Sequence, residues 1–154
     1  MIVRAGRRGD RDALEAVIRS DATFKPAEVA VALEVIDGAL GGDPDYQLRV
    51  IEDGGAIAGY LCYGRTPMTE RTFDLYWVCV DAAARGRGLA AALVAAMEDE
   101  IRSMGGGSIR VETSLTDGYG AARRLYEKLG YPLLAQLPDF YSPGDDLLTY
   151  YKRV

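Results

Sequence analysis

The chain has 154 residues, of which 49% are hydrophobic and 27% charged, so we expect one globular domain that spans residues 1–154. Its net charge of -5 argues against a nucleic-acid partner, which would need a positive surface. The absence of histidine excludes Ser-His and Cys-His catalysis and most zinc sites, so no metal is expected. Charges interrupt every apolar run and no secretory signal is apparent, so we expect a cytoplasmic protein without a membrane partner.

Hydrophobic periodicity and turn residues predict the elements along the chain. Expected strands cover residues 2–5, 46–51, 56–63, 71–80, 108–113, 133–140 and 147–152, and expected helices cover 10–19, 26–40, 89–104 and 119–129. Asp10 is a candidate helix cap, and Asp53-Gly54-Gly55 is typical of a hairpin turn. One right-handed βαβ crossover, through the helix at 89–104, should make two strands parallel. The expected class is α/β, with helices on both faces of a mostly antiparallel mixed sheet.

The segment Arg85-Gly86-Arg87-Gly88-Leu89-Ala90 joins an apolar strand to a helix. Free N–H groups in the first turn of a helix attract anions, and glycines allow a phosphate to approach closely. The alternative is a plain strand-to-helix turn in which the glycines serve geometry alone. A P-loop is excluded because Leu89 and Ala90 stand where Lys and Ser or Thr are needed. A dinucleotide-binding fold is excluded because the turn follows a meander.

This segment resembles the acyl-CoA pyrophosphate loop of the GNAT acetyltransferases, Gln/Arg-x-x-Gly-x-Gly/Ala, with Arg85, Gly88 and Ala90 at its fixed positions. The stretch from Ala122 to Tyr131 is similar to the family's later helix, which ends in a Gly-aromatic pair. The element order also matches the family over essentially the whole chain. One departure is Tyr119, which stands where the family often has an Asn near the pantetheine arm.

The resemblance implies a GNAT fold, acetyl-CoA as the acyl donor, direct acetyl transfer to a primary amine, and a possible homodimer. The acceptor would be a small amine, an amino acid derivative or a peptide amine. A backbone N–H near residues 78–80 would hold the thioester carbonyl, while the side chains there join the core. The implied cofactor-binding residues are Val78, Cys79, Val80, Arg85, Gly86, Arg87, Gly88, Leu89, Ala90 and Tyr126.

Two residues are candidates for proton transfer. Tyr126 matches the family tyrosine near the cofactor sulfur and could protonate the CoA thiolate, although core packing is the alternative. Asp74 resembles the position of a general base and could act through a water, with a salt bridge or a strand-edge position as the alternative. Glu112 is a second candidate for the base. Period-two alternation predicts Asp74, Tyr76 and Val78 on one face of their strand.

The acceptor pocket implied by the family is built from residues 24–35, 64–72 and 140–146. The last segment carries two acids and two aromatic residues and resembles a hairpin in some GNATs that acetylate peptide N-termini or small amines. Its alternative is a tight turn with acids exposed for solubility. Candidate substrate-binding residues are Tyr76, Glu112 and Tyr141. We expect Trp77 to pack under a helix, and Cys62 and Cys79 to be buried.

Other functions stay open at this stage. The fold could serve as an acyl-CoA-binding sensor or interaction module with little turnover. It could use another donor, such as succinyl- or malonyl-CoA. A nucleotide-phosphate binder that uses the glycine turn is a third alternative.

Overall fold

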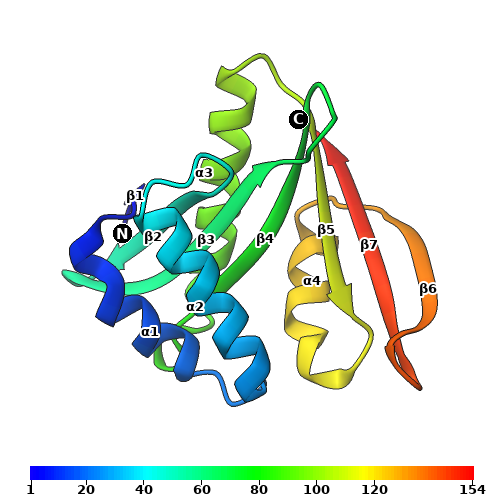
Figure 1. The fold of residues 1–154 in the computed structure, drawn as a ribbon, viewed down its shortest axis with the longest axis horizontal. Coiled ribbons are helices and arrows are strands. Elements are labelled where there is room, and N and C mark those ends of the chain that lie inside the picture. The colour runs from blue at the N-terminus through cyan, green and yellow to red at the C-terminus, as the bar shows by residue number, and fades with distance from the viewer.

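The computed structural model describes residues 1–154 and contains one seven-stranded sheet with the order β1-β2-β3-β4-β5-β7-β6 (Figure 1). The strands are β1 (Ile2–Ala5), β2 (Gln47–Asp53), β3 (Ala56–Arg65), β4 (Thr72–Val80), β5 (Ser108–Ser114), β6 (Leu133–Ser142) and β7 (Asp145–Arg153). The helices are α1 (Arg11–Arg19), α2 (Pro26–Leu40), α3 (Leu89–Ser103) and α4 (Gly120–Lys128). Only β4 and β5 pair in parallel, so the predicted mixed sheet is confirmed.

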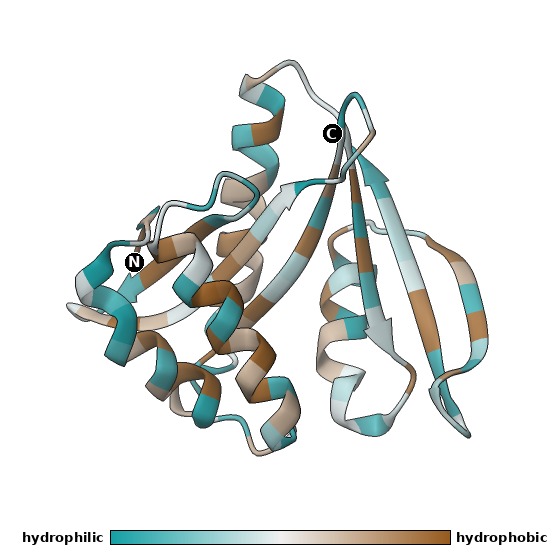
Figure 2. Ribbon diagram, viewed as in Figure 1, coloured by the Kyte–Doolittle hydropathy of each residue, from teal (hydrophilic) through white to brown (hydrophobic).

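Helices cover both faces of the sheet and enclose two apolar cores. The α1/α2 core includes Leu14, Ile18, Ile36, Val50, Tyr60 and Cys79. The α3/α4 core includes Ile51, Leu61, Leu75, Leu93, Met97 and Tyr126. Adjacent strand residues therefore face opposite cores, which explains the long hydrophobic bands of β3 and β4 (Figure 2). No helix has both the length and the apolar character needed to span a membrane.

A bulge in β4 changes which side chains face which core. The β3–β4 register shifts at Tyr76, which has no partner on β3. Because an extra residue reverses the alternation, Val78 packs with Leu75 in the α3/α4 core, whereas Trp77 packs against the α1/α2 core. The expectation that Val78 shares a face with Asp74 was therefore wrong.

The sheet divides at its only parallel pair. Pairing between β4 and β5 covers just four positions, Thr72–Leu75 with Ser108–Val111, after which the strands diverge (Figure 1). The second half of β4 thus has no neighbouring strand on its β5 side. Strands β1–β4 form one half of the molecule, and β5, β7 and β6 form the other.

The role predicted for Asp10 was wrong. A 3-10 turn at Arg8–Asp10 precedes α1, and the Asp10 side chain makes no capping hydrogen bond to that helix. Instead the carboxylate accepts the Arg7 N–H at 2.7 Å and two hydrogen bonds from the Arg4 guanidinium at 2.8 and 3.0 Å. Asp10 is only 8% exposed, so it connects β1 to the start of α1.

Both cysteines are buried and unpaired, as the sequence predicted. Burial raises the pKa of Cys62 to about 12 and that of Cys79 to about 12. A thiol with such a pKa carries almost no thiolate at neutral pH. The cysteines therefore act as small core residues.

Candidate active site

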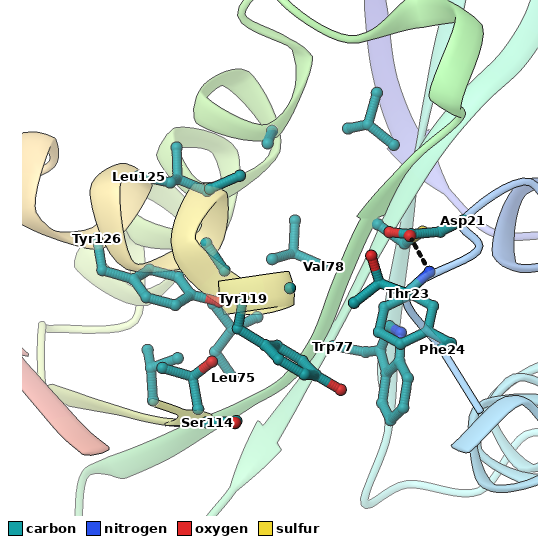
Figure 3. A pocket seen from close by; sticks show the side chains of 18 of the residues that line it. Asp21, Thr23, Phe24, Leu75, Trp77, Val78, Ser114, Tyr119, Leu125 and Tyr126 are labelled. Carbon is teal, nitrogen blue, oxygen red and sulfur yellow. Dashed lines mark hydrogen bonds between the residues drawn. The ribbon is translucent and has the colours of Figure 1, made fainter. Parts of the chain in front are cut away.

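A cleft of about 1340 Å³ opens where β4 and β5 diverge. Its walls come from the α1–α2 loop, β4, the start of α3, β5, α4 and the β6–β7 hairpin. Phe24 and Trp77 lie on one side of the cleft, and Leu125 and Tyr126 lie on the other (Figure 3). Every predicted site residue except Arg87 lines this cleft.

The start of α3 forms the anion-attracting part of the cleft. Gly86 and Gly88 have φ values of 77° and 78°, in the left-handed region that glycine tolerates best. Gly88 precedes the first helical residue, and its carbonyl accepts the first intrahelical bond, from the Ala92 N–H at 3.0 Å. The N–H groups of residues 89–91 therefore have no partner within the helix. A Cβ at Gly88 would meet no atom within 4 Å, so the turn leaves room for a ligand.

The two arginines of this turn are both paired with carboxylates. The Arg85 guanidinium donates to Asp21 at 2.6 Å and remains 49% exposed at the edge of the cleft. Asp21 also accepts the Thr23 N–H at 2.9 Å, which fixes the α1–α2 loop beside the glycine turn (Figure 3). Arg87 instead pairs with Asp53 at the β2–β3 hairpin. Of these two arginines, only Arg85 is therefore placed to contact a ligand in the cleft.

Tyr126 lies in the last turn of α4 with its ring in the core and its hydroxyl at the cleft (Figure 3). The turn is closed by Gly130 at φ 78°, while the Tyr131 N–H donates to the Tyr126 carbonyl at 2.9 Å. The hydroxyl has no hydrogen-bond partner within the chain. Burial, with a smaller effect from Tyr150, raises the pKa of Tyr126 above its ordinary value of 10.0. The phenol therefore stays protonated at neutral pH and can donate a proton or a hydrogen bond.

Asp74 has both carboxylate oxygens engaged. One accepts from Arg110 Nε at 2.7 Å, and the other accepts from the Thr66 hydroxyl at 2.8 Å. The salt bridge considered for this residue is thus present, and Asp74 is 9% exposed. Tyr76 lies beside it at the bulge, packed edge-on against Tyr46 with ring centroids 5.6 Å apart.

Three carboxylates, Glu28, Glu112 and Asp145, gather around Tyr141, and we call this region the acidic end of the cleft. Burial raises the pKa of Tyr141 above its ordinary value, and the charges of these three residues raise it further. The Tyr119 hydroxyl donates to Glu28 from across the cleft. Burial and this hydrogen bond raise the pKa of Tyr119. The acidic end therefore attracts cations.

Trp77 packs against the α1/α2 core, as the sequence predicted, and it also lines the cleft. Its ring lies 5.5 Å from that of Phe24 (Figure 3). The indole Nε1 is buried without a hydrogen-bond partner. Trp77 and Phe24 together form an aromatic wall opposite Tyr126.

The model of the acetyltransferase (GNAT) family matches residues 14–131, which is most of the chain. The chain belongs to this family. The predicted class of enzyme, an acyltransferase of the GNAT type, is thereby confirmed. The structure of a protein from Desulfovibrio desulfuricans assigned to the GNAT acetyltransferases is 35% identical and superposes with a TM-score of 0.92, covering 98% of this chain and 97% of that one.

Two less similar N-acetyltransferase structures share the fold. An aminoglycoside 6'-N-acetyltransferase in complex with coenzyme A is 19% identical, with a TM-score of 0.77 over 99% of this chain and 97% of that one. The ribosomal-protein-S18-alanine N-acetyltransferase of Escherichia coli is 17% identical, with a TM-score of 0.78 over 99% of this chain and 93% of that one. No curated protein sequence gave a significant match.

Sequence reasoning missed several residues of this GNAT cleft. Glu28 falls within the segment expected to form the acceptor pocket, but nothing in the sequence links it to Tyr119. Arg110 could have been found, because a parallel pairing of the two strands places it opposite Asp74. Asp21 gave no signal, since its pairing with Arg85 joins residues that are 64 positions apart.

Proposed function

We propose that this GNAT acetyltransferase transfers an acetyl group from acetyl-CoA directly to a primary amine, on a small amine, an amino acid derivative or a peptide. One observation carries the proposal. The same cleft contains a helix N-terminus suited to a pyrophosphate, an acidic end suited to an ammonium group, and the free hydroxyl of Tyr126. The acidic end attracts the acceptor while the glycine turn selects the donor.

The residues at the start of α3 fit the pyrophosphate of coenzyme A. The N–H groups of residues 89–91 and the exposed Arg85 would bind it, and the open space at Gly88 admits it. Acetyl-CoA, when bound, supplies an activated acetyl thioester. Those backbone N–H groups of residues 78–80 that point away from β3 have no strand beside them on the β5 side and would orient the thioester carbonyl.

The transfer needs one bond to form and one to break. The amine nitrogen bonds to the carbonyl carbon, the carbon–sulfur bond breaks, and the thiolate leaves with the electron pair. Tyr126 then gives its hydroxyl proton to the thiolate, and the proton that the nitrogen loses leaves through Asp74 or a chain of waters. A proton from solvent then restores the Tyr126 hydroxyl. Binding both reactants in one cleft lowers the barrier further by orienting them.

A thiol-release assay tests the proposal, using acetyl-CoA against a panel of amines, amino acids and peptides. The enzyme's own cysteines are buried and contribute little background. We expect turnover with at least one acceptor class and binding of coenzyme A in calorimetry. Absence of both would contradict the proposal.

The same experiment separates the alternatives. Binding of coenzyme A without turnover on any acceptor would indicate a sensor or interaction module. Faster turnover with succinyl- or malonyl-CoA would identify a different donor. Competition by ATP but not by coenzyme A would indicate a nucleotide-phosphate binder.

A cytoplasmic location and a homodimer stay predictions. Strand β6 is exposed along its whole length, and Leu134, Leu137 and Phe140 are among its exposed apolar side chains. This surface supports association with a second copy, which would remove apolar area from water. Light scattering should then give twice the 16.7 kDa mass of one chain.

A further inference from the structure

Arg110 presents a guanidinium to the cleft with both terminal nitrogens free of hydrogen bonds. Its Nε donates to Asp74 at 2.7 Å, and this is the only hydrogen bond of the side chain. The next carboxylate oxygen, from Glu112, lies 3.8 Å from Nη1, which is beyond hydrogen-bond distance. The Arg110 side chain is 40% exposed and lines the cleft. Its outer edge is therefore available to a ligand.

The surrounding structure fixes the direction of this guanidinium. Arg110 and Asp74 are direct partners in the parallel pairing, one position before the strands diverge. Asp74 is itself held by the Thr66 hydroxyl at 2.8 Å. A guanidinium is planar, and its two terminal nitrogens match the two oxygens of a carboxylate, so the hydrogen bond at Nε sets the direction in which this pair of donors points.

The cleft therefore contains both signs of charge. The acidic end attracts the ammonium form of an acceptor, whereas Nη1 and Nη2 of Arg110 are free to donate hydrogen bonds to an anion. An anionic group on the acceptor would take the free Nη1 and Nη2 positions, whereas an acceptor without such a group leaves them to water and to Glu112 at 3.8 Å. A small molecule with one amine and one carboxylate satisfies both parts of the cleft.

We propose that Arg110 binds a carboxylate of the acceptor, so that the substrate class is free amino acids or other small amines that carry a carboxylate. The inference rests on the proposed acetyl transfer and narrows its acceptor. In this arrangement Asp74 is a positioning residue for Arg110, and the proton of the amine leaves through water.

The test compares acceptors that differ only in the carboxylate. Free amino acids, their carboxamides and the corresponding amines without a carboxyl group are assayed by thiol release with acetyl-CoA. A charge-assisted pair corresponds to a preference of about 10- to 100-fold in kcat/KM for the acid over the amide. Arg110→Gln should reduce this ratio to near one, and Arg110→Lys should retain part of it.

Control variants separate recognition from folding. Arg19→Gln removes an exposed arginine that pairs only with Glu15, and it should leave the ratio unchanged. The double variant Asp74→Asn with Arg110→Gln avoids leaving the Asp74 carboxylate without its Arg110 partner, so its ratio of kcat/KM for acid over amide should also be near one if Arg110 provides the preference. Circular dichroism and thermal unfolding confirm that each variant is folded.

Three outcomes would overturn the inference. These are a wild-type ratio of one or less, a folded Arg110→Gln variant with an unchanged ratio, and a preference for diamines over amino acids. If carboxamides or diamines still release thiol, acetyl transfer stands and only the carboxylate assignment fails. If no acceptor releases thiol, both proposals fail, and calorimetry with coenzyme A shows whether the donor site is also wrong.

Discussion

Individual hydrogen bonds determine which ionisable side chains in the cleft are available for proton transfer. Asp74 has both oxygens engaged, by Arg110 and Thr66, whereas the hydroxyl of Tyr126 has no partner. Burial of a phenol favours its neutral form, so Tyr126 is protonated at neutral pH, as the proposed acid role requires. Whether Asp74 or Tyr126 is available for proton transfer therefore depends more on the neighbouring side chains than on the residue type.

Replacing Tyr126 with Phe should lower kcat about 10- to 100-fold, near the lower end of the usual effect of general acid catalysis. The affinity for coenzyme A should change less than about twofold, because the ring keeps its packing and only the hydroxyl is lost. Steady-state kinetics and calorimetry measure the two quantities. Tyr150→Phe is a matched control, since its ring centroid lies 5.6 Å from that of Tyr126 while its hydroxyl bonds Glu127. An unchanged kcat in Tyr126→Phe would rule out the acid role.

Replacing Asp10 with Asn should destabilise the protein by about 1–3 kcal/mol at pH 7, because the Arg4 guanidinium loses a buried charged partner. The hydrogen bond from Arg4 lowers the pKa of Asp10 below its ordinary value of 3.8. The stabilisation is therefore complete above about pH 4 and is lost as the pH falls through the folded-state pKa. Urea unfolding at pH 7 and pH 3 should show that the free energy of unfolding of Asp10→Asn differs less from that of wild type at the lower pH.

Asp12→Asn is the control for this prediction. Asp12 is exposed in the first turn of the same helix, so its loss should cost about 0.5 kcal/mol or less. If the loss of unfolding free energy in Asp10→Asn relative to wild type stays constant or grows at pH 3, the pairing of Asp10 with Arg4 would be contradicted.

Candidate site residues could be predicted from the sequence where a local motif specifies them. Arg85, Gly88 and Ala90 stand at fixed spacing on one turn, and the glycine after α4 places Tyr126 one turn earlier. Pairings across the fold could not be predicted in this way. The contacts of Asp10 depend on how β1 packs beside α1, and the partner of Asp74 depends on strand register.

Among the elements, the glycine turn before α3 has the most direct link to function. It combines a left-handed backbone at Gly88 with unpaired N–H groups in the first helical turn. Such N–H groups suit an anion, and the missing side chain leaves room for one. A substitution that keeps the fold but fills this space should therefore weaken donor binding selectively.

Gly88→Ala should raise the dissociation constant of coenzyme A at least tenfold, because its methyl group enters the space left for the pyrophosphate. Gly42→Ala is the matched control, since Gly42 also has a left-handed φ, of 90°, and open space around its Cβ, at the end of α2. Both variants should lose about 1–2 kcal/mol of stability through backbone strain alone. Equal affinity for coenzyme A in the two variants would remove the turn from the binding site.

Every predicted helix and strand exists, because hydrophobic periodicity marks most of them and a Gly or Pro stands beside most of their ends. The bulge at Tyr76 could not be predicted, since it is a property of the pairing between β3 and β4 rather than of either strand alone. It is also the reason that Val78 faces the α3/α4 core while Trp77 faces the other one. The divergence of β4 from β5 likewise depends on the whole sheet.

The whole molecule is two half-sheets joined at one short seam. The four pairs between β4 and β5 are the only strand pairing between the halves, and the cleft occupies the rest of the boundary. The proposed donor would lie between β4 and β5, in the place where a continuous sheet would have hydrogen bonds between the two strands. Donor binding should consequently stabilise the molecule as a unit.

Coenzyme A at about 100 times its dissociation constant should stabilise the chain by about 2.7 kcal/mol. For a protein of this size, the melting temperature should then rise by about 5–10 °C. Hydrogen exchange should slow at the amides of residues 76–80 that face away from β3, since they gain a partner. Exchange there that is insensitive to coenzyme A would contradict a ligand at the seam.

The short seam also bears on how long the protein survives. A protease cuts a folded chain mainly through transient openings, and the rate follows the population of the opened form. Since only four residue pairs between β4 and β5 resist separation of the halves, a bound ligand would shift that population strongly. The lifetime of this enzyme would then follow the supply of its acyl donor, and a shortage of donor would leave fewer intact molecules to consume it.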